Sequence, residues 1–232
     1  MTGAQRREQL IGIGRSTFAE RGLEGTSVEE IAHRAGVSKP VIYEHFGGKE
    51  GLYNAVVEEE MGRLNETITE SISLGRSRVR IERAVLALLT YVEEHTDGFV
   101  ILVRDSGGIG AAGAHAPHGY STLLNDATDK VSHILGAAFT RNGLNESIAP
   151  VYSQALVGMV SQTAQWWLDV RHPDKETVAA HIVNLCWNGL AGMETDPQLH
   201  EDVEGPAAER GVVLGAGADA DPAEAVRSGR TP

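Results

Sequence analysis

The stretch TSVEEIAHRAGVSKPVIYEHFGGKEGL, residues 26–52, carries the strongest fold signal in the chain. Thr26 and Ser27 are each followed three residues later by a glutamate, the pattern of a capping box at a helix N-terminus in either of two registers. Gly36 suits the end of that helix, and Ser38 is a preferred residue for capping the next one. The stretch therefore predicts two short helices joined by a tight turn, a helix-turn-helix.

The second of these helices has one apolar face and one face free for another molecule. Ile42 and Phe46 are four residues apart, so they share a side of the helix and are expected to be buried together. The remaining face carries side chains that can reach base edges or phosphates in a DNA major groove. These residues are Ser38, Lys39, Pro40, Val41, Tyr43 and Glu44.

Apolar residues at helical spacing continue along most of the chain, and no run alternates polar and apolar residues as a strand does. The fold class predicted from this pattern is all-α. Asp174 is expected to cap the last helix, which a tight turn at His172-Pro173 joins to the helix before it as an antiparallel pair. Further helices are expected within residues 7–22, 48–73, 78–95, 97–106, 120–143, 150–173 and 174–193.

Residues 18–53, FAERGLEGTSVEEIAHRAGVSKPVIYEHFGGKEGLY, closely resemble the DNA-binding segment of the TetR family of bacterial transcriptional regulators. In that family one helix precedes and another follows the helix-turn-helix, as the pattern predicts here. The resemblance implies a two-domain homodimer in which residues 4–64 bind DNA and residues 65–196 bind an effector and dimerise. Residues 197–232 are expected to form a disordered acidic tail.

The resemblance also assigns roles to residues at the matching positions. Thr26 and Lys49 match residues that contact phosphates, and Tyr43 and His45 match residues that lie along the DNA backbone. The N-terminal residues of the second helix match positions that contact bases. The full set expected to bind a palindromic double-stranded DNA operator is Thr26, Ser27, Ser38, Lys39, Pro40, Val41, Tyr43, Glu44, His45 and Lys49.

A family member of this kind usually represses transcription until a small molecule binds its C-terminal domain and changes the spacing of the two DNA-binding helices. A ligand-independent regulator or an activator is the alternative. The aromatic and methionine content favours an apolar effector. The residues expected to line its pocket are Tyr91, Phe99, Leu102, Tyr120, Leu124, Met159 and Trp166.

The last two helices have wide apolar faces that include small residues. By the same resemblance, they are expected to pack against their copies in a second protomer as a four-helix bundle. The residues expected at this dimer interface are Val160, Trp167, Ile182, Leu185, Gly189 and Met193.

Charge and composition bound the remaining possibilities. The chain has a net charge of −12, but residues 1–50 contain seven basic and seven acidic residues, so a DNA-binding face can form there. The single cysteine, Cys186, excludes a disulfide framework and suits the cytoplasm. No signal peptide, membrane span, metal-ligand motif or cofactor is expected.

One motif favours a different class of protein. Gly108–Gly113 reads Gly-x-Gly-x-x-Gly after an apolar run, as in a nucleotide-binding enzyme. A Rossmann site needs a strand before the first glycine and a helix after the last, whereas the preceding run has helical spacing and Pro117 follows. Residues 107–117 are instead expected to form a loop at the mouth of the effector pocket.

Five residues depart from the family pattern, and three of them lie in the first helix. Gly12 and Gly14 stand where better helix formers are usual, and each is expected to cost that helix about 1 kcal/mol relative to alanine. Thr17 replaces a common leucine, and Gly47 and Gly48 replace a polar pair.

Overall fold

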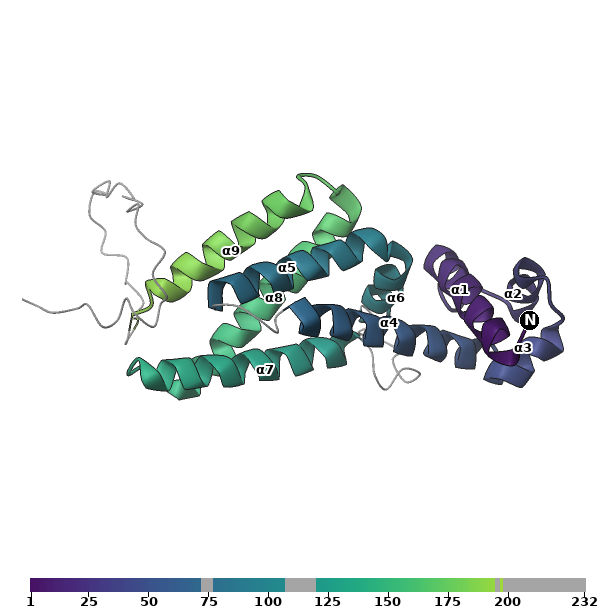
Figure 1. The fold of residues 1–232 in the computed structure, drawn as a ribbon, viewed down its shortest axis with the longest axis horizontal. Helices are drawn as coiled ribbons and strands as arrows, with labels where there is room; N and C mark the ends of the chain where they lie inside the picture. The colour runs from purple at the N-terminus through teal and green to yellow at the C-terminus, as the bar shows by residue number, and fades with distance from the viewer. Residues whose placement is uncertain (72–76, 107–119, 195–196, 198–232) are drawn as a thin grey trace, which may run out of the picture.

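A computed structural model of the 232-residue chain describes residues 1–71, 77–106, 120–194 and 197. Every regular element in these ranges is helical, as the sequence pattern predicted, and none is a strand (Figure 1). The elements are α1 (Gly3–Arg21), α2 (Val28–Ala35), α3 (Lys39–Phe46), α4 (Lys49–Ser71), α5 (Ser77–Glu94), α6 (Thr96–Ser106), α7 (Tyr120–Arg141), the 3-10 helix η1 (Glu146–Ile148), α8 (Ala149–Val170) and α9 (Lys175–Ala191).

The N-terminal helices form a small domain around one apolar core. Helices α1, α2 and α3 and the first turns of α4 pack together at one end of the molecule (Figure 1). Their buried side chains include Leu10, Phe18, Ile31, Ile42 and Leu52. This core fixes the angle between α2 and α3, which hold the helix-turn-helix predicted from the sequence.

Local capping explains where these short helices begin and end. The Ser27 hydroxyl accepts a hydrogen bond from the Glu30 backbone amide at 3.1 Å, which selects Ser27 as the N-cap of α2. Gly36 has φ +64° and ψ +36°, a left-handed conformation that glycine adopts at little cost. It ends α2 and lets the chain turn sharply into α3.

The glycines of α1 have opposite surroundings. A Cβ atom added at Gly14 would lie 3.1 Å from Leu52 Cδ2, so Gly14 allows α1 to approach α4 closely. Gly12 is exposed, with open space around it. The helix nevertheless runs unbroken from Gly3 to Arg21. Close packing is therefore a physical reason for Gly14, but not for Gly12.

The C-terminal helices form a second, larger bundle. The middle of α4 packs against α5 and α6, and α6 also packs along α1. Helices α8 and α9 run in opposite directions from their shared turn but splay apart, so that α8 packs mainly on α7 and α9 on α5 (Figure 1). This differs from the close antiparallel pair expected from the sequence. Asp174 does cap α9, accepting a hydrogen bond from the Thr177 amide at 2.7 Å.

The glycine motif at 108–113 and the expected gating loop at 107–117 lie outside the described residues, as does the expected acidic tail apart from Pro197. The apolar run before the motif is described and is helical: it belongs to α6, which begins at Thr96. Asp97 lies in the first turn of α6, directly after the first residue of the helix. A helix in place of a strand removes the main requirement of a Rossmann site.

Candidate nucleic-acid interface

Helix α3 turns one side to the core and the other to the outside. Ile42 is completely buried, and the guanidinium of Arg7 lies 5.3 Å from the centre of the Phe46 ring, which anchors the end of α3 to α1. Tyr43 is 55% exposed, a large value for a tyrosine on a short, well-packed helix. The other exposed residues on α3 and at its N-cap are Ser38, Lys39, Pro40 and Glu44.

The N-cap residue of α3 has a side-chain hydroxyl that does not cap the helix. Ser38 is the N-cap residue, but its side chain makes no capping hydrogen bond. Pro40 occupies the first turn, where its missing amide hydrogen removes no helical bond. Val41 is half-buried and packs against the core, so it presents less surface than the sequence pattern suggested.

A second part of the outer surface lies where α3 meets α4. Gly47 and Gly48 have φ values of +75° and +143°, which glycine adopts more readily than other residues. The Tyr43 ring lies against Gly48, because a Cβ added there would be 3.6 Å from its Cε1 atom. Lys49 is the first residue of α4 and is half-exposed, like His45. The turn thus places Tyr43 against the residue that precedes Lys49, which lies at a helix N-terminus, where anions are favoured.

Thr26 and Ser27 support this surface from the turn before α2. Thr26 is buried, and its hydroxyl donates a hydrogen bond to the Gly22 carbonyl at 2.7 Å. Its side chain therefore stabilises the turn instead of facing outward as a phosphate ligand would. Ser27 is exposed, although its hydroxyl already accepts from an amide of α2.

The one lysine on the outer side of α3 has an acidic partner. Lys39 Nζ lies 2.9 Å from Glu29 Oε2, which belongs to α2. Hydrogen bonding and the positive charge of Lys39 hold the pKa of Glu29 below its usual value, so this carboxylate is ionised at neutral pH. Both side chains are largely exposed.

The expected effector pocket is only partly brought together. Tyr91, Phe99 and Leu102 are buried, and the rings of Tyr91 and Phe99 pack edge to face with centres 6.4 Å apart. Leu124 and Met159 are half-buried against the same core, whereas Trp166 is 49% exposed. The side chain of Tyr120 lies outside the described residues. A hollow of about 320 Å³ is lined by Arg15, Glu94, His95, Thr96, Asp97 and Gly98, none of which was expected at the pocket.

Some of the residues expected at the dimer interface are likewise buried within the protomer, whereas others are exposed. Trp167 and Ile182 are buried within the protomer, and the Trp167 indole donates to the Pro173 carbonyl at 2.7 Å. Leu185 is 64% exposed and Gly189 lies on the same side of α9. Val160 and Met193 are half-buried. The two tryptophans therefore have the reverse of their expected placements, Trp167 in the core and Trp166 on the surface.

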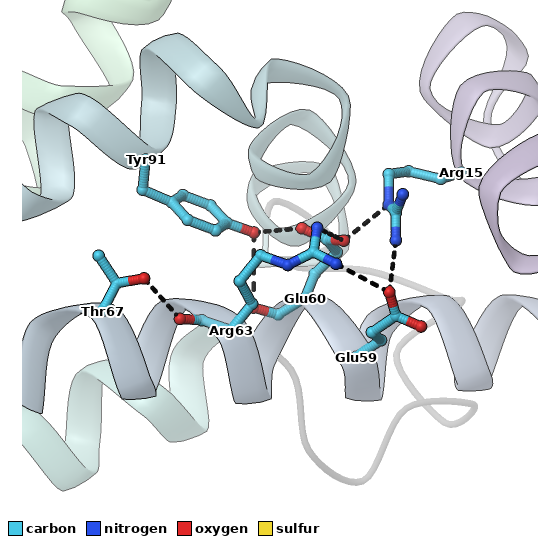
Figure 2. A network of polar contacts seen from close by, with 6 residues as sticks. All are labelled: Arg15, Glu59, Glu60, Arg63, Thr67 and Tyr91. Carbon is cyan, nitrogen blue, oxygen red and sulfur yellow. Dashed lines mark hydrogen bonds and ion pairs between the residues drawn. The ribbon is translucent and has the colours of Figure 1, made fainter. Parts of the chain in front are cut away.

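Sequence reasoning missed the buried charge cluster around Glu60. This glutamate is completely buried in the middle of α4, between Tyr91 of α5 and Arg15 of α1 (Figure 2). It is the last residue of the run Glu58-Glu59-Glu60, which reads as an ordinary charged helix surface. Gly98 of α6, 38 residues later in the chain, makes room for it, and the sequence carries no signal that links the two.

Two family models match the chain. Residues 11–56 match the bacterial regulatory proteins of the tetR family, and residues 77–189 match the tetracyclin repressor-like C-terminal domain. The chain belongs to the TetR family. It is therefore a DNA-binding transcriptional regulator and not an enzyme. Its all-α fold, with an N-terminal helix-turn-helix and a C-terminal helical domain, is the one that the sequence predicted.

The curated relatives include both a transcriptional activator and transcriptional repressors. The HTH-type transcriptional activator FasR of Mycolicibacterium smegmatis is 29% identical over 81% of this chain and 84% of its own length. The transcriptional repressor AcnR of Corynebacterium efficiens is 37% identical over 28% of this chain. The chain spans 35% of the length of that repressor.

Solved structures show the same fold. A TetR-like transcriptional regulator from Rhodococcus sp. RHA1 superposes with a TM-score of 0.70 at 24% identity and covers 83% of this chain and 100% of its own. The fatty acid degradation regulator FadR from Bacillus halodurans superposes with a TM-score of 0.63 at 17% identity, covering 80% and 96%. In the described part of the chain, no helix is both long and apolar enough to cross a lipid bilayer.

Proposed function

We propose that this TetR-family chain acts in the cytoplasm as a homodimer that binds a palindromic operator and is released by a small effector. Helix α3 is the part that reads DNA. The observation that carries this proposal is the outward side of α3, where four exposed residues stand above a completely buried Ile42. A helix held this firmly by its other side can enter a major groove without losing its own packing.

Within this proposal, the contacts divide into two kinds. Ser38, Lys39, Pro40 and Glu44 lie on the N-terminal and outer side of α3, where base edges would be reached. Tyr43 packs on Gly48, the residue before Lys49, at the turn into α4, where the adjacent backbone would be held. Of the remaining expected contacts, Ser27 is exposed and Val41 and His45 are half-exposed, whereas the buried Thr26 would act by stabilising the turn before α2.

Selection of bound fragments from random duplex DNA with the purified full chain tests the proposal. We expect enrichment of one inverted repeat whose two half-sites are a whole number of helical turns apart, because a two-fold dimer presents two copies of α3 to one side of the duplex. Enrichment of a single unrepeated site would overturn the dimeric arrangement. A selection that enriches no sequence would overturn sequence-specific binding altogether.

Glu29 is expected to lower the affinity of the protein for DNA of any sequence. The ion pair with Lys39 must open before the lysine reaches DNA, and the freed carboxylate then faces phosphate. An exposed pair contributes about 0.5 kcal/mol, or about 1 kcal/mol for two protomers. We therefore expect Glu29→Gln to tighten binding to non-specific duplex about five-fold at low salt, and less at high salt.

Fluorescence anisotropy with an unrelated duplex at two salt concentrations measures this change. Glu93→Gln is the matched control, because Glu93 forms an exposed ion pair with Lys175 at 2.5 Å in the C-terminal domain. Equal affinities for the wild type and Glu29→Gln would contradict the expected restraint.

The surface of α8 and α9 supports the dimer. Val151, Trp166 and Val170 are exposed on one side of α8, and Leu185 is exposed on α9. We expect Leu185→Lys to convert the dimer to a monomer, because a lysine charge would have to be buried in the four-helix interface. Sedimentation velocity measures this. Ile134→Lys on α7, where the isoleucine is 58% exposed, is the control. A folded Leu185→Lys chain that remains dimeric would contradict this interface.

The direction of regulation is the finer part of the proposal. A dimer seated on a promoter blocks transcription, and AcnR and KstR2 among the relatives are named repressors. Activation is the second candidate, because FasR, which matches over most of both chains, is named an activator. Transcription in vitro from a promoter that carries the selected site distinguishes them: repression lowers the transcript level and activation raises it.

A further inference from the structure

Glu60 is in contact with three other helices through one buried carboxylate. Its Oε2 atom accepts a hydrogen bond from the Tyr91 hydroxyl of α5 at 2.5 Å, and its Oε1 atom lies 2.6 Å from Arg15 Nε of α1 (Figure 2). Gly98 of α6 is so close that a Cβ atom there would be 2.0 Å from Oε2. Glu60 thus joins a helix of the DNA-binding domain to two helices of the C-terminal domain.

The charges around Glu60 are balanced within a small group. Arg63, one turn along α4, lies 3.1 Å from Glu60 Oε1 and 2.9 Å from Glu59 Oε1. Arg15 Nη2 also pairs with Glu59 Oε1, at 2.7 Å. Two guanidinium groups therefore face two carboxylates, but only Arg15 comes from outside α4. Arg15 is therefore the residue of this group that moves when α1 moves.

Complete burial makes this arrangement sensitive to movement. A carboxylate taken out of water needs its hydrogen-bond and charge partners, since leaving it short of them costs far more than at the surface. Burial, together with the hydrogen bond to Glu60, raises the pKa of Tyr91, so its hydroxyl stays protonated and remains a donor. A shift of α5 or α6 that moves Tyr91 or Gly98 must therefore move the carboxylate as well.

Space for such a shift lies beside the cluster. Arg15 and Gly98 both line the hollow of about 320 Å³ between α1 and the corner of α5 and α6. A densely packed contact would hold these side chains in one place, whereas an open one allows the Arg15 guanidinium to follow its partner. Arg104 of α6 also donates a hydrogen bond to the Ala19 carbonyl of α1, so α6 holds α1 at a second point.

We propose that Glu60 is a positioning residue that passes a displacement of α5 and α6 to α1, and so sets the orientation of α3 on DNA. The inference rests on the proposed function for its consequence at the operator. Its structural part is that Tyr91 controls the ion pair between Arg15 and Glu60 of α4, and this part depends only on the contacts described above. Arg15 and Tyr91 do not need to touch, because each acts on a different oxygen of the same carboxylate.

A double-mutant cycle with Arg15→Lys and Tyr91→Phe tests the proposal. Operator affinity is measured well below the melting temperature, so that every variant is folded. We expect each single variant to change operator affinity about five-fold or more in the same direction, at the lower end of known couplings between sites. The double variant should differ from either single one by less than two-fold, because both act through Glu60.

Arg34→Lys provides the control for the cycle. Arg34 lies on α2 and pairs with Glu20 at 2.8 Å and Glu30 at 3.1 Å, away from Glu60. Its effect should add to that of Tyr91→Phe. Additive effects of Arg15→Lys and Tyr91→Phe would overturn the proposal, as would a Tyr91→Phe variant that melts lower but binds the operator unchanged.

Hydrogen exchange provides a readout without DNA. In Tyr91→Phe we expect faster exchange of the α1 amides around Arg15 and unchanged exchange in α9. Uniformly faster exchange would indicate a merely structural role for Tyr91 and would overturn the proposal. If the wild type binds no operator but α1 responds in this way, the proposed function fails while the coupling stands.

Discussion

Replacing Gly98 by alanine should lower the free energy of unfolding by about 3 kcal/mol, at the upper end of the cost of overpacking a core. The added methyl group would lie 2.0 Å from Glu60 Oε2 and 2.5 Å from Glu60 Cδ. That carboxylate cannot simply swing away, because it is completely buried and held by Tyr91 and Arg15. Either α6 must retreat from α4 or Glu60 must leave its partners.

Urea denaturation at a fixed protein concentration measures this loss, since the stability of the proposed dimer would depend on concentration. Gly62→Ala is the matched control. Gly62 lies on α4 near Glu60, is exposed, and has open space where the Cβ would be placed. It should gain up to about 1 kcal/mol from the better helix propensity of alanine. A Gly98→Ala protein as stable as the wild type would show that α4 and α6 are not held at this distance.

The DNA-binding half of the fold could be predicted from sequence because its signals are local. Ser27 caps α2 and Gly36 ends it, both within a few residues of the helix they bound. Ile42 and Phe46 mark the inner side of α3 by their spacing alone. Thr26 shows the limit of such reasoning: the two possible cap registers were indistinguishable until the hydroxyl was seen to bond to Gly22.

The packing of the C-terminal helices could not be predicted from the sequence to the same degree. Trp166 and Trp167 are adjacent, so they point about 100° apart on a helix, and a wide apolar face gives no reason to bury one and not the other. The packing of α8 on α7 and of α9 on α5 makes that choice. Such contacts join residues far apart in the chain, which helical periodicity does not report.

The Glu60 cluster could not be predicted for the same reason, because it depends on contacts between residues far apart in the chain. A glutamate inside a helix is normally solvated, and burial of a charge is rare unless partners surround it. Besides Arg63 on the same helix, those partners are Arg15 and Tyr91, 45 and 31 residues away in the chain. Only the fold brings them together, so no local pattern could have singled out the third residue of an acidic run.

Removal of both Tyr43 and Lys49 should weaken operator binding about 1,000-fold while leaving a folded dimer. Each side chain is expected to contact the DNA backbone once in each protomer, so the double alanine variant loses four contacts. At about 1 kcal/mol each, the loss is about 4 kcal/mol. Tyr43 is 55% exposed and Lys49 half-exposed, so neither substitution opens a cavity in the core.

The two single variants should separate by their dependence on salt. A lysine that neutralises a phosphate releases a counterion, so Lys49→Ala in a dimer should make the plot of log affinity against log salt concentration less steep by about 2. A hydrogen bond from the Tyr43 hydroxyl to a phosphate releases no counterion, so Tyr43→Ala should weaken binding without changing that slope. Both variants should lose affinity for operator and unrelated DNA alike, because backbone contacts carry no base information.

Electrophoretic or anisotropy titrations across a range of salt concentrations measure these slopes. Lys130→Ala on α7 removes the same charge from an exposed site in the C-terminal domain and should leave the slope unchanged. Full operator affinity in the double variant would reject the α3–α4 turn as a DNA-binding surface. A lower slope in Tyr43→Ala would instead show that loss of the ring displaces Lys49, because the ring packs on Gly48, the residue before that lysine.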